Sequence, residues 1–219
     1  IIKDAMAQWQ GAYGWPSWSL SNHDVVRFPT RLADNDPQRT KLMLALLLTL
    51  RGTAFLYQGD ELGLPHAKVP FERLLDPEAI AFWPSGIGRD GARTPMPWSQ
   101  TQNMAGFTSA PDAWLPLDPR HAALAVDTQT NAESILAFTR AMIQLRRSSL
   151  ALREGAFVPL DAPDAVLAFE RNANGQRLLC VFNLGAERVD WPLPANAATR
   201  LTVGQVQQME KTASLGGYS

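Results

Sequence analysis

The sequence predicts a segment of an α/β barrel over residues 1–148, followed by an all-β antiparallel domain over residues 149–219. Two observations support the barrel: a strand, a long apolar helix and a second strand follow one another, and each strand ends on a group of polar residues. Active sites of α/β barrels lie at the carboxyl ends of their strands. The β-domain is predicted because short strands, separated by Pro, Asn and Gly turns, follow residue 149.

The first strand is expected over residues 17–21. It follows the end of a helix at residues 1–10, in which apolar residues recur at helical spacing, and a turn-rich stretch at residues 11–16. The strand ends on the polar residues 22–24.

A long helix is expected to connect this strand to the next. Asp36 is suited to the N-cap and Pro37 to the first helical position, and Gly52 ends the helix after about Leu50. Because the helix is apolar on nearly all sides, we expect it to be buried. The second strand, residues 53–57, is fully apolar, as in a parallel sheet that is covered on both faces.

Residues 62–131 are irregular and hold most of the prolines and three tryptophans. Loops of this length inside a compact domain are usually functional or disordered, and the aromatic content argues against disorder. A further helix is expected over residues 132–147. Residues 166–182 are typical of a β-hairpin whose turn is Asn-Ala-Asn-Gly at residues 172–175.

Composition and charge exclude several classes of function. The net charge is −1 and Lys and Arg are scattered, so neither nucleic acid nor a membrane is expected as a partner. The longest apolar run, residues 42–48, is far shorter than the roughly 20 residues of a membrane span. The single cysteine, Cys180, lies in an apolar run and favours a structural thiol and a cytoplasmic location. Without an initiator Met or a signal peptide, the chain is expected to begin inside a longer protein.

Asn22-His23-Asp24 is the first motif that can carry chemistry. A carboxylate beside an imidazole at a strand end can serve acid–base or electrostatic chemistry, or hold a metal. A bare tripeptide of this kind more often forms a turn that caps the strand. Because no third ligand of suitable spacing lies nearby, we expect no metal here, and no cofactor.

Two further motifs follow the second strand. In residues 58–63, two glycines permit a tight turn, and Asp60 and Glu61 are either catalytic or, as we favour, hydrogen-bonded to backbone N–H groups or arginines. In residues 88–98, Arg89 and Arg93 flank an Asp in a loop rich in Gly and Pro. Arginine there can hold a sugar hydroxyl or a carboxylate, or form a structural pair with the Asp.

Taken together, the three motifs resemble the α-amylase clan of glycoside hydrolases, family thirteen, in its oligo-1,6-glucosidase and α-glucosidase branch. Residues 21–24 are similar to the end of the seventh barrel strand, and residues 52–63 to the eighth strand and its loop. The run Arg-Asp-Gly-Ala-Arg-Thr-Pro-Met-Pro-Trp at residues 89–98 resembles a signature of this branch, and residues 69–84 resemble bacterial α-glucosidases. The resemblance covers essentially the whole chain and implies the last two strand–helix units of the barrel.

The resemblance assigns roles to four residues. Asp24 matches the third catalytic carboxylate, which stabilises the transition state. His23 matches the imidazole that bonds hydroxyls of the sugar in the −1 subsite. Arg93 matches the arginine that holds the non-reducing end of the substrate together with an N-terminal Asp. Arg27 matches a substrate-binding position near the subsite.

The resemblance also implies what this chain lacks. The nucleophilic Asp and the general acid Glu of the family lie on earlier strands and would precede Ile1. The missing N-terminal part of the barrel is therefore an expected partner, and the isolated chain is expected to be inactive. The loop that binds a metal ion in relatives also lies upstream.

The expected function is that of a retaining α-glucosidase, a hydrolase of carbohydrate metabolism. Its expected substrates are maltose, sucrose or short oligosaccharides with terminal α-linked glucose. A glucosyl transferase or a trehalose-forming relative shares the same motifs and stays open as an alternative. A third alternative, from another class, is a non-catalytic binding or assembly module.

Overall fold

The computed structural model describes residues 2–9, 14–85, 88–194, 197–209 and 211–219. The chain divides into two compact units. The first unit comprises residues 1–18, 41–54 and 142–219, and the second unit comprises residues 19–40 and 55–141. The predicted division into residues 1–148 and 149–219 stays a prediction.

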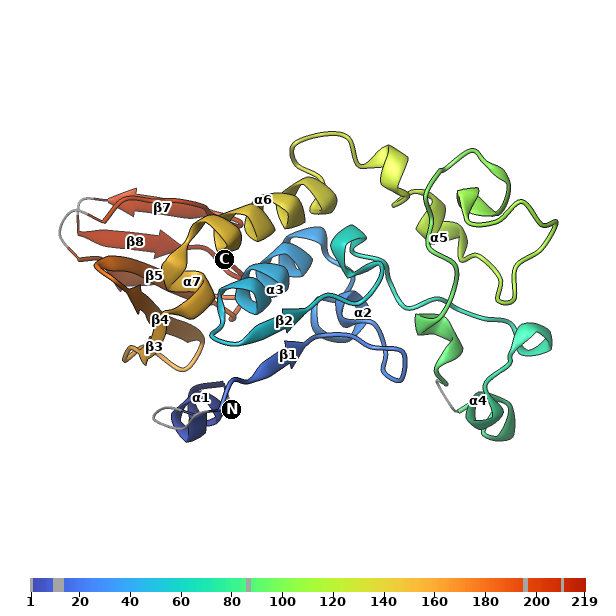
Figure 1. Cartoon of the computed structure of the whole chain (residues 1–219), viewed down its shortest axis with the longest axis horizontal. Helices are drawn as coiled ribbons and strands as arrows, with labels where there is room; N and C mark the ends of the chain where they lie inside the picture. The colour runs from blue at the N-terminus through green and yellow to red at the C-terminus, as the bar shows by residue number, and fades with distance from the viewer. Residues whose placement is uncertain (1, 10–13, 86–87, 195–196, 210) are drawn as a thin grey trace. The chain divides into compact units, whose positions relative to one another are not determined.

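The described helices and strands follow the predicted order closely (Figure 1). The α-helices are α1 (Ile2–Trp9), α2 (Phe28–Leu32), α3 (Pro37–Thr49), α4 (Pro77–Ala81), α5 (Pro119–Ala122), α6 (Ile135–Ser148) and α7 (Leu150–Glu154). The strands are β1 (Ser17–Ser19), β2 (Thr53–Phe55), β3 (Ala156–Pro159), β4 (Val166–Ala173), β5 (Gln176–Asn183), β6 (Val189–Pro192), β7 (Val206–Met209) and β8 (Thr212–Leu215). Short 3₁₀ helices occupy Asp60–Leu62, Phe71–Arg73, Asp90–Ala92, Asn103–Gly106 and Val126–Thr128.

The strand–helix–strand arrangement of the first half is present. β1 and β2 form a two-stranded sheet, and Figure 1 draws them side by side and pointing the same way. The α3 helix begins at Pro37 as predicted, and the Asp36 carboxylate accepts a hydrogen bond from the Arg39 amide at 2.8 Å. Part of the predicted turn before β1, residues 11–13, lies outside the described residues.

The expectation that the second strand is covered on both faces is wrong for this chain. Thr53 and Phe55 are exposed, and Phe55 keeps 55% of its surface accessible. Within the described ranges, β2 has only β1 as a neighbour in its sheet, which leaves much of its surface without packing partners. In contrast, α3 is buried as predicted, since its residues from Leu44 to Leu48 are all at most 6% exposed.

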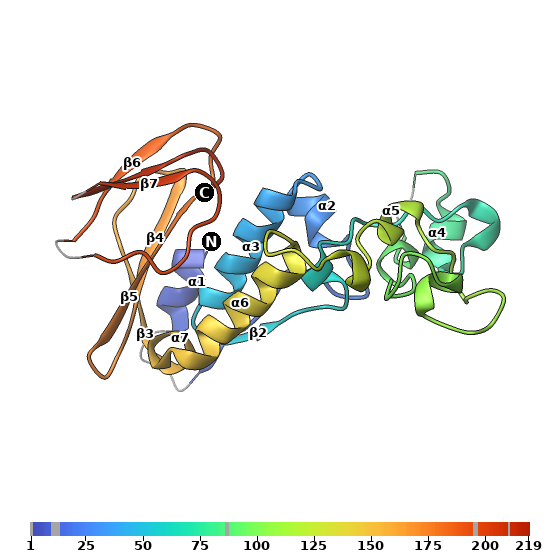
Figure 2. The same cartoon turned by 90° about the horizontal axis from the view of Figure 1, so that it is seen from above.

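Two arginines, Arg171 buried and Arg146 half-buried, cap the end of α3, and the sequence pattern did not reveal them. The last carbonyls of a helix lack intrahelical partners and carry partial negative charge. In the first unit, Arg146 donates to the carbonyls of Leu48, Leu50 and Gly52, and Arg171 donates to that of Thr49. Both views show α3 and α6 running side by side (Figures 1 and 2). The contacts therefore join α6 and β4 to the end of α3.

The β-rich part consists of two antiparallel sheets, as the turn pattern predicted. One has the strand order β3-β4-β5 and the other β6-β8-β7. The predicted hairpin joins β4 and β5 through Asn174 and Gly175, both of which have positive φ. A two-residue turn of this kind matches the twist of its strands. Side chains of both sheets form a core of Val166, Ala168, Trp191, Ala213 and Leu215.

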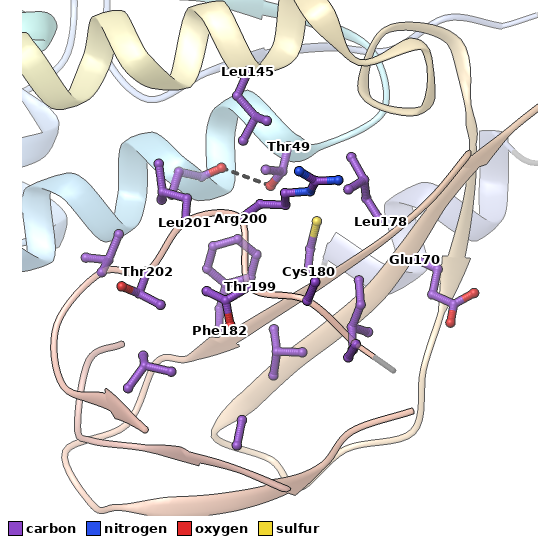
Figure 3. Close-up of a pocket in the computed structure, with 18 of the residues that line it drawn as sticks. Thr49, Leu145, Glu170, Leu178, Cys180, Phe182, Thr199, Arg200, Leu201 and Thr202 are labelled. Carbon is purple, nitrogen blue, oxygen red and sulfur yellow. Dashed lines mark hydrogen bonds between the residues drawn. The ribbon is translucent and has the colours of Figure 1, made fainter. Parts of the chain in front are cut away.

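A cavity of about 700 Å³ lies within the first unit. Apolar side chains of α3, α6 and β5 line it, together with residues between β6 and β7 (Figure 3). Cys180 points into it near Thr49, and burial raises the pKa of its thiol to about 12. A thiol so hard to ionise has the structural character that the sequence favoured.

Candidate active site

The three predicted motifs meet in the second unit. The segment after β1 (residues 21–27), the segment after β2 (residues 57–63) and the loop at residues 88–98 are joined by hydrogen bonds. These segments are up to 70 positions apart in the sequence. The folded chain thus brings together three motifs that are separate in the sequence.

Asp24 lies at the centre of this site. Its backbone amide donates to the side chain of Asn22 at 2.8 Å, so the tripeptide does form a turn at the strand end. The turn leaves the Asp24 carboxylate half-exposed, with 48% of its side chain accessible. The structural and the chemical interpretation of Asn22-His23-Asp24 are therefore compatible.

Three cationic or polar side chains surround the Asp24 carboxylate. Arg93 Nη2 lies 3.0 Å from Oδ1, and Arg89 Nη1 lies 3.6 Å from the same oxygen. His23 Nε2 lies 3.1 Å from Oδ2. Arg93 also donates from Nε to the backbone carbonyl of His23 at 2.9 Å. These contacts hold a negative charge in a fixed place at the surface of the unit.

Arg27 lies behind this site and is fully buried. Its Nη1 donates to the carbonyl of Gln58 at 2.6 Å and its Nη2 to that of Ala92 at 2.9 Å. The guanidinium also lies over the ring of Tyr57, 5.3 Å from its centroid. Arg27 thus ties the segment after β2 to the loop that carries Arg93.

The carboxylates of the second motif brace the turn after β2, as favoured from the sequence. Asp60 is fully buried and accepts from the Tyr57 amide at 3.0 Å, while Glu61 accepts from the Gly59 amide at 2.8 Å. Burial raises the pKa of Asp60 to about 6, although the Ser21 hydroxyl, the Tyr57 amide and the Arg27 charge partly offset it.

Asp90 of the third motif is also structural, but its partners differ from the expected arginine pair. It is buried and accepts from the backbone amides of Leu75 and Asp76 at 2.7 and 2.8 Å. The arginine of the pair, Arg89, binds Asp76 instead, with Nη2 2.6 Å from Oδ1. The sequence contained both residues but no signal that joined them, because they lie 13 positions apart in an irregular stretch.

Among the carboxylates of the three segments, only Asp24 offers an exposed oxygen held by side-chain cations. Asp60, Glu61 and Asp90 each accept from backbone amides. In the described part of the chain, no three His, Cys, Asp or Glu side chains gather in a way that could hold a metal ion. No helix among the described residues is long and apolar enough to cross a membrane.

Comparison with known proteins gives a consistent result. Residues 1–155 match the family described as "Alpha amylase, catalytic domain". The chain is 39% identical over 185 residues to a probable alpha-glucosidase of Rhizobium meliloti (strain 1021). This match covers 83% of this chain and 33% of the relative. It is 30% identical over 219 residues to an oligo-1,6-glucosidase of Halalkalibacterium halodurans, and this match covers 89% of this chain and 39% of the relative.

Solved structures of similar proteins superpose on nearly the whole chain. An alpha-glucosyl transfer enzyme, XgtA, has a TM-score of 0.88 at 42% identity, and the superposition covers 100% of this chain and 42% of the XgtA chain. Isomaltulose synthase PalI from Klebsiella sp. LX3 has a TM-score of 0.82 at 29% identity, and the superposition covers 99% of this chain and 44% of the PalI chain. The chain therefore spans between a third and under half of the length of these proteins.

Proposed function

The chain belongs to the α-amylase catalytic-domain family, and on that basis we propose that it is part of a retaining α-glucosidase. The substrates would be maltose, sucrose or short oligosaccharides with a terminal α-linked glucose. The chain would supply the last two strand–helix units of the barrel and, from residue 149, a β-domain. The observation that carries the proposal is the Asp24 carboxylate, half-exposed and held by Arg93 and His23.

A fixed carboxylate suits the transition state of glycoside hydrolysis. This state is oxocarbenium-like, with positive charge at the anomeric carbon and a flattened ring. Asp24 would accept hydrogen bonds from the 2- and 3-hydroxyls, and these strengthen as positive charge develops on the ring. Interactions that are stronger in the transition state than in the ground state are the ones that accelerate the reaction.

Hydrolysis with retention needs two further carboxyl groups about 5–5.5 Å apart, one as nucleophile and one as acid and base. The carboxylates beside Asp24 in the three segments are bonded to backbone amides and are unsuited to either role. We therefore place the nucleophile and the acid in the upstream part of the barrel, which the chain needs as a partner. The isolated chain should then be inactive.

The remaining predicted residues divide into two roles. His23 and Arg93 border the exposed carboxylate and can reach sugar hydroxyls, Arg93 together with an upstream Asp. Arg27, predicted to bind substrate, is instead proposed to support the site, because its buried guanidinium is bonded to backbone carbonyls. A cytoplasmic location is also proposed, on the character of Cys180 alone.

Glucosyl transfer is the second candidate function. XgtA, the structure with a TM-score of 0.88, is described as an alpha-glucosyl transfer enzyme, and isomaltulose synthase is similar over 99% of this chain. Hydrolysis and transfer share the glucosyl-binding half of the site and differ in the acceptor. A non-catalytic binding module is less well supported, since it gives no reason for the arginines around Asp24.

The test uses this chain joined to the upstream part of the Rhizobium meliloti relative. Sucrose and maltose are supplied separately, and ¹H NMR follows the glucose anomer that forms first from sucrose, whose leaving group is fructose. Release of α-glucose supports a retaining hydrolase, and isomeric disaccharides support transfer. Initial release of β-glucose, or no turnover of either sugar, would overturn the proposal.

A further inference from the structure

Arg89 lies between two carboxylates in the second unit. Its Nη2 is 2.6 Å from Asp76 Oδ1, and its Nε donates to both oxygens of Asp76 at 3.2 Å. Its Nη1, the third nitrogen of the guanidinium, is 3.6 Å from Asp24 Oδ1. One edge of the Arg89 guanidinium therefore faces the buried Asp76 carboxylate, and the remaining nitrogen faces the proposed catalytic carboxylate of Asp24.

Asp76 holds Arg89 firmly. The Asp76 side chain is 0% exposed and also accepts from the backbone amides of Arg89 and Glu78, at 2.7 and 3.3 Å. Hydrogen bonds from Arg89 lower the pKa of Asp76 to about 2, and the same pairing raises the pKa of Arg89. Because a guanidinium is planar and rigid, fixing Nε and Nη2 also fixes the direction of Nη1.

The exposed pair formed by Arg73 and Asp112 lacks this anchoring. Arg73 has similar exposure to Arg89, 38% against 36%, but its partner Asp112 is 60% exposed. Such surface pairs hold neither partner firmly, because water competes for both charges. The buried partner is what makes Arg89 suited to positioning a second group.

Arg93 and Arg89 both face the same oxygen of Asp24, but they differ in freedom. Arg93 is bonded to Asp24 and to a backbone carbonyl, and in the proposed function its guanidinium also binds sugar. Arg89 is tied to Asp76, so we expect its guanidinium to keep its position when sugar enters. It would then be the cation that keeps the Asp24 carboxylate oriented.

We propose that Arg89, anchored by Asp76, is a positioning residue for Asp24. The inference rests on the proposed function and adds a residue to it. Removing the guanidinium frees the Asp24 carboxylate to turn away from the sugar, which weakens transition-state bonds more than ground-state bonds. Arg89→Gln should lower kcat about tenfold with a much smaller change in KM.

A double-mutant cycle separates positioning from loop support. The joined enzyme is assayed on α-glucosyl fluoride, an activated substrate, as Arg89→Gln, Asp24→Asn and the double variant. If Arg89 acts through Asp24, Arg89→Gln costs about tenfold with Asp24 present and little in the Asp24→Asn background. An equal loss in both backgrounds would overturn the proposal. Arg73→Gln is the matched control and should leave kcat unchanged.

A second measurement needs no turnover and uses this chain alone. The ¹⁵N–¹H resonance of Arg89 Nε reports on the guanidinium between the two acids. Asp24→Asn should shift that resonance, and Asp112→Asn should shift that of Arg73 but not that of Arg89. An Arg89 resonance unmoved by Asp24→Asn would remove the proposal. If this link is present but the unaltered joined enzyme turns over no substrate, the proposed function fails instead.

Discussion

Arg93 Nη2 lies 3.0 Å from Asp24 Oδ1, although the two residues are 69 positions apart in the sequence. Both were assigned to the site by resemblance, one as a catalytic carboxylate and one as a clamp for the sugar. Their contact places the two motifs next to each other, as the proposed site requires. In the proposed function Arg93 then has two tasks, because the guanidinium nitrogens proposed to bind sugar also face Asp24.

Arg93→Lys in the joined enzyme should reduce kcat/KM by about 10- to 150-fold. Lysine cannot reproduce the planar fork that bonds Asp24 and the His23 carbonyl, and a hydrogen bond to a charged group contributes about 1.5–3 kcal/mol. Steady-state kinetics on maltose and a melting curve measure the two effects. An unchanged kcat/KM with a lowered melting temperature would leave Arg93 a purely structural role.

Gly59→Ala should damage the site through Arg27. A Cβ there would lie 2.5 Å from Leu64 Cδ1 and 2.9 Å from Arg27 Nη1, in a backbone with φ of +86°. Gly175→Ala is the matched control, since its φ is +80° but nothing lies within 4 Å of the added atom. We expect a loss of about 1 kcal/mol for Gly175→Ala and clearly more for Gly59→Ala, measured by urea unfolding. Equal losses would show that the crowding around Arg27 is unimportant.

Arg146→Met should destabilise the first unit by about 2–4 kcal/mol. It removes donors from the carbonyls of Leu48, Leu50 and Gly52 at the end of α3, where a positive charge is also favourable. Arg147→Met alters the exposed neighbour in the same turn and should change stability by less than about 0.5 kcal/mol. Thermal unfolding of the two variants gives the comparison, and similar melting temperatures would contradict the capping role.

The buried Asp60 carboxyl and the half-buried His66 imidazole, whose pKa values are shifted in opposite directions, should shape the dependence of the free energy of unfolding on pH. Burial raises the pKa of Asp60 to about 6. The contribution of Asp60 to the free energy of unfolding is therefore present below about pH 4 and is lost as the pH rises through 6. Burial, together with the charge of Arg27, lowers the pKa of His66 to about 4. The contribution of His66 to the free energy of unfolding is therefore present above about pH 6.5 and is lost as the pH falls through 4.

Asp60→Asn removes the contribution of Asp60 and leaves that of His66. The free energy of unfolding should then fall more steeply between pH 6.5 and pH 4 than in the unaltered chain, by up to about 3 kcal/mol. Urea unfolding at several pH values measures the slope. A slope that becomes shallower would show that Asp60 is ionised and favourably paired over this range.

Local chemistry explains which parts could be predicted from the sequence. Asp36 and Pro37 set the start of α3, and Asn174 with Gly175 sets the β4–β5 turn, because caps and tight turns depend on a few neighbouring residues. The start of α6 was placed three residues early. Ser134 caps it instead, with Oγ accepting from the Ala137 amide at 3.1 Å.

Contacts between distant segments could not be predicted in this way. Arg89 and Asp76 lie in an irregular loop, where no periodicity relates one position to another. Burial of Arg27 and Arg171 was also missed, because arginine is rarely fully buried and only the folded structure supplies the carbonyls that accept its hydrogen bonds.

The most direct test of the proposed role of Asp24 is the kcat/KM of Asp24→Asn on an aryl α-glucoside, in the joined enzyme. Asparagine keeps the shape of the side chain but removes the charge that would stabilise the oxocarbenium-like state. We expect kcat/KM to fall by about a thousandfold or more while the melting temperature stays close to that of the unaltered enzyme. A fall of less than about tenfold would contradict a catalytic role for this carboxylate.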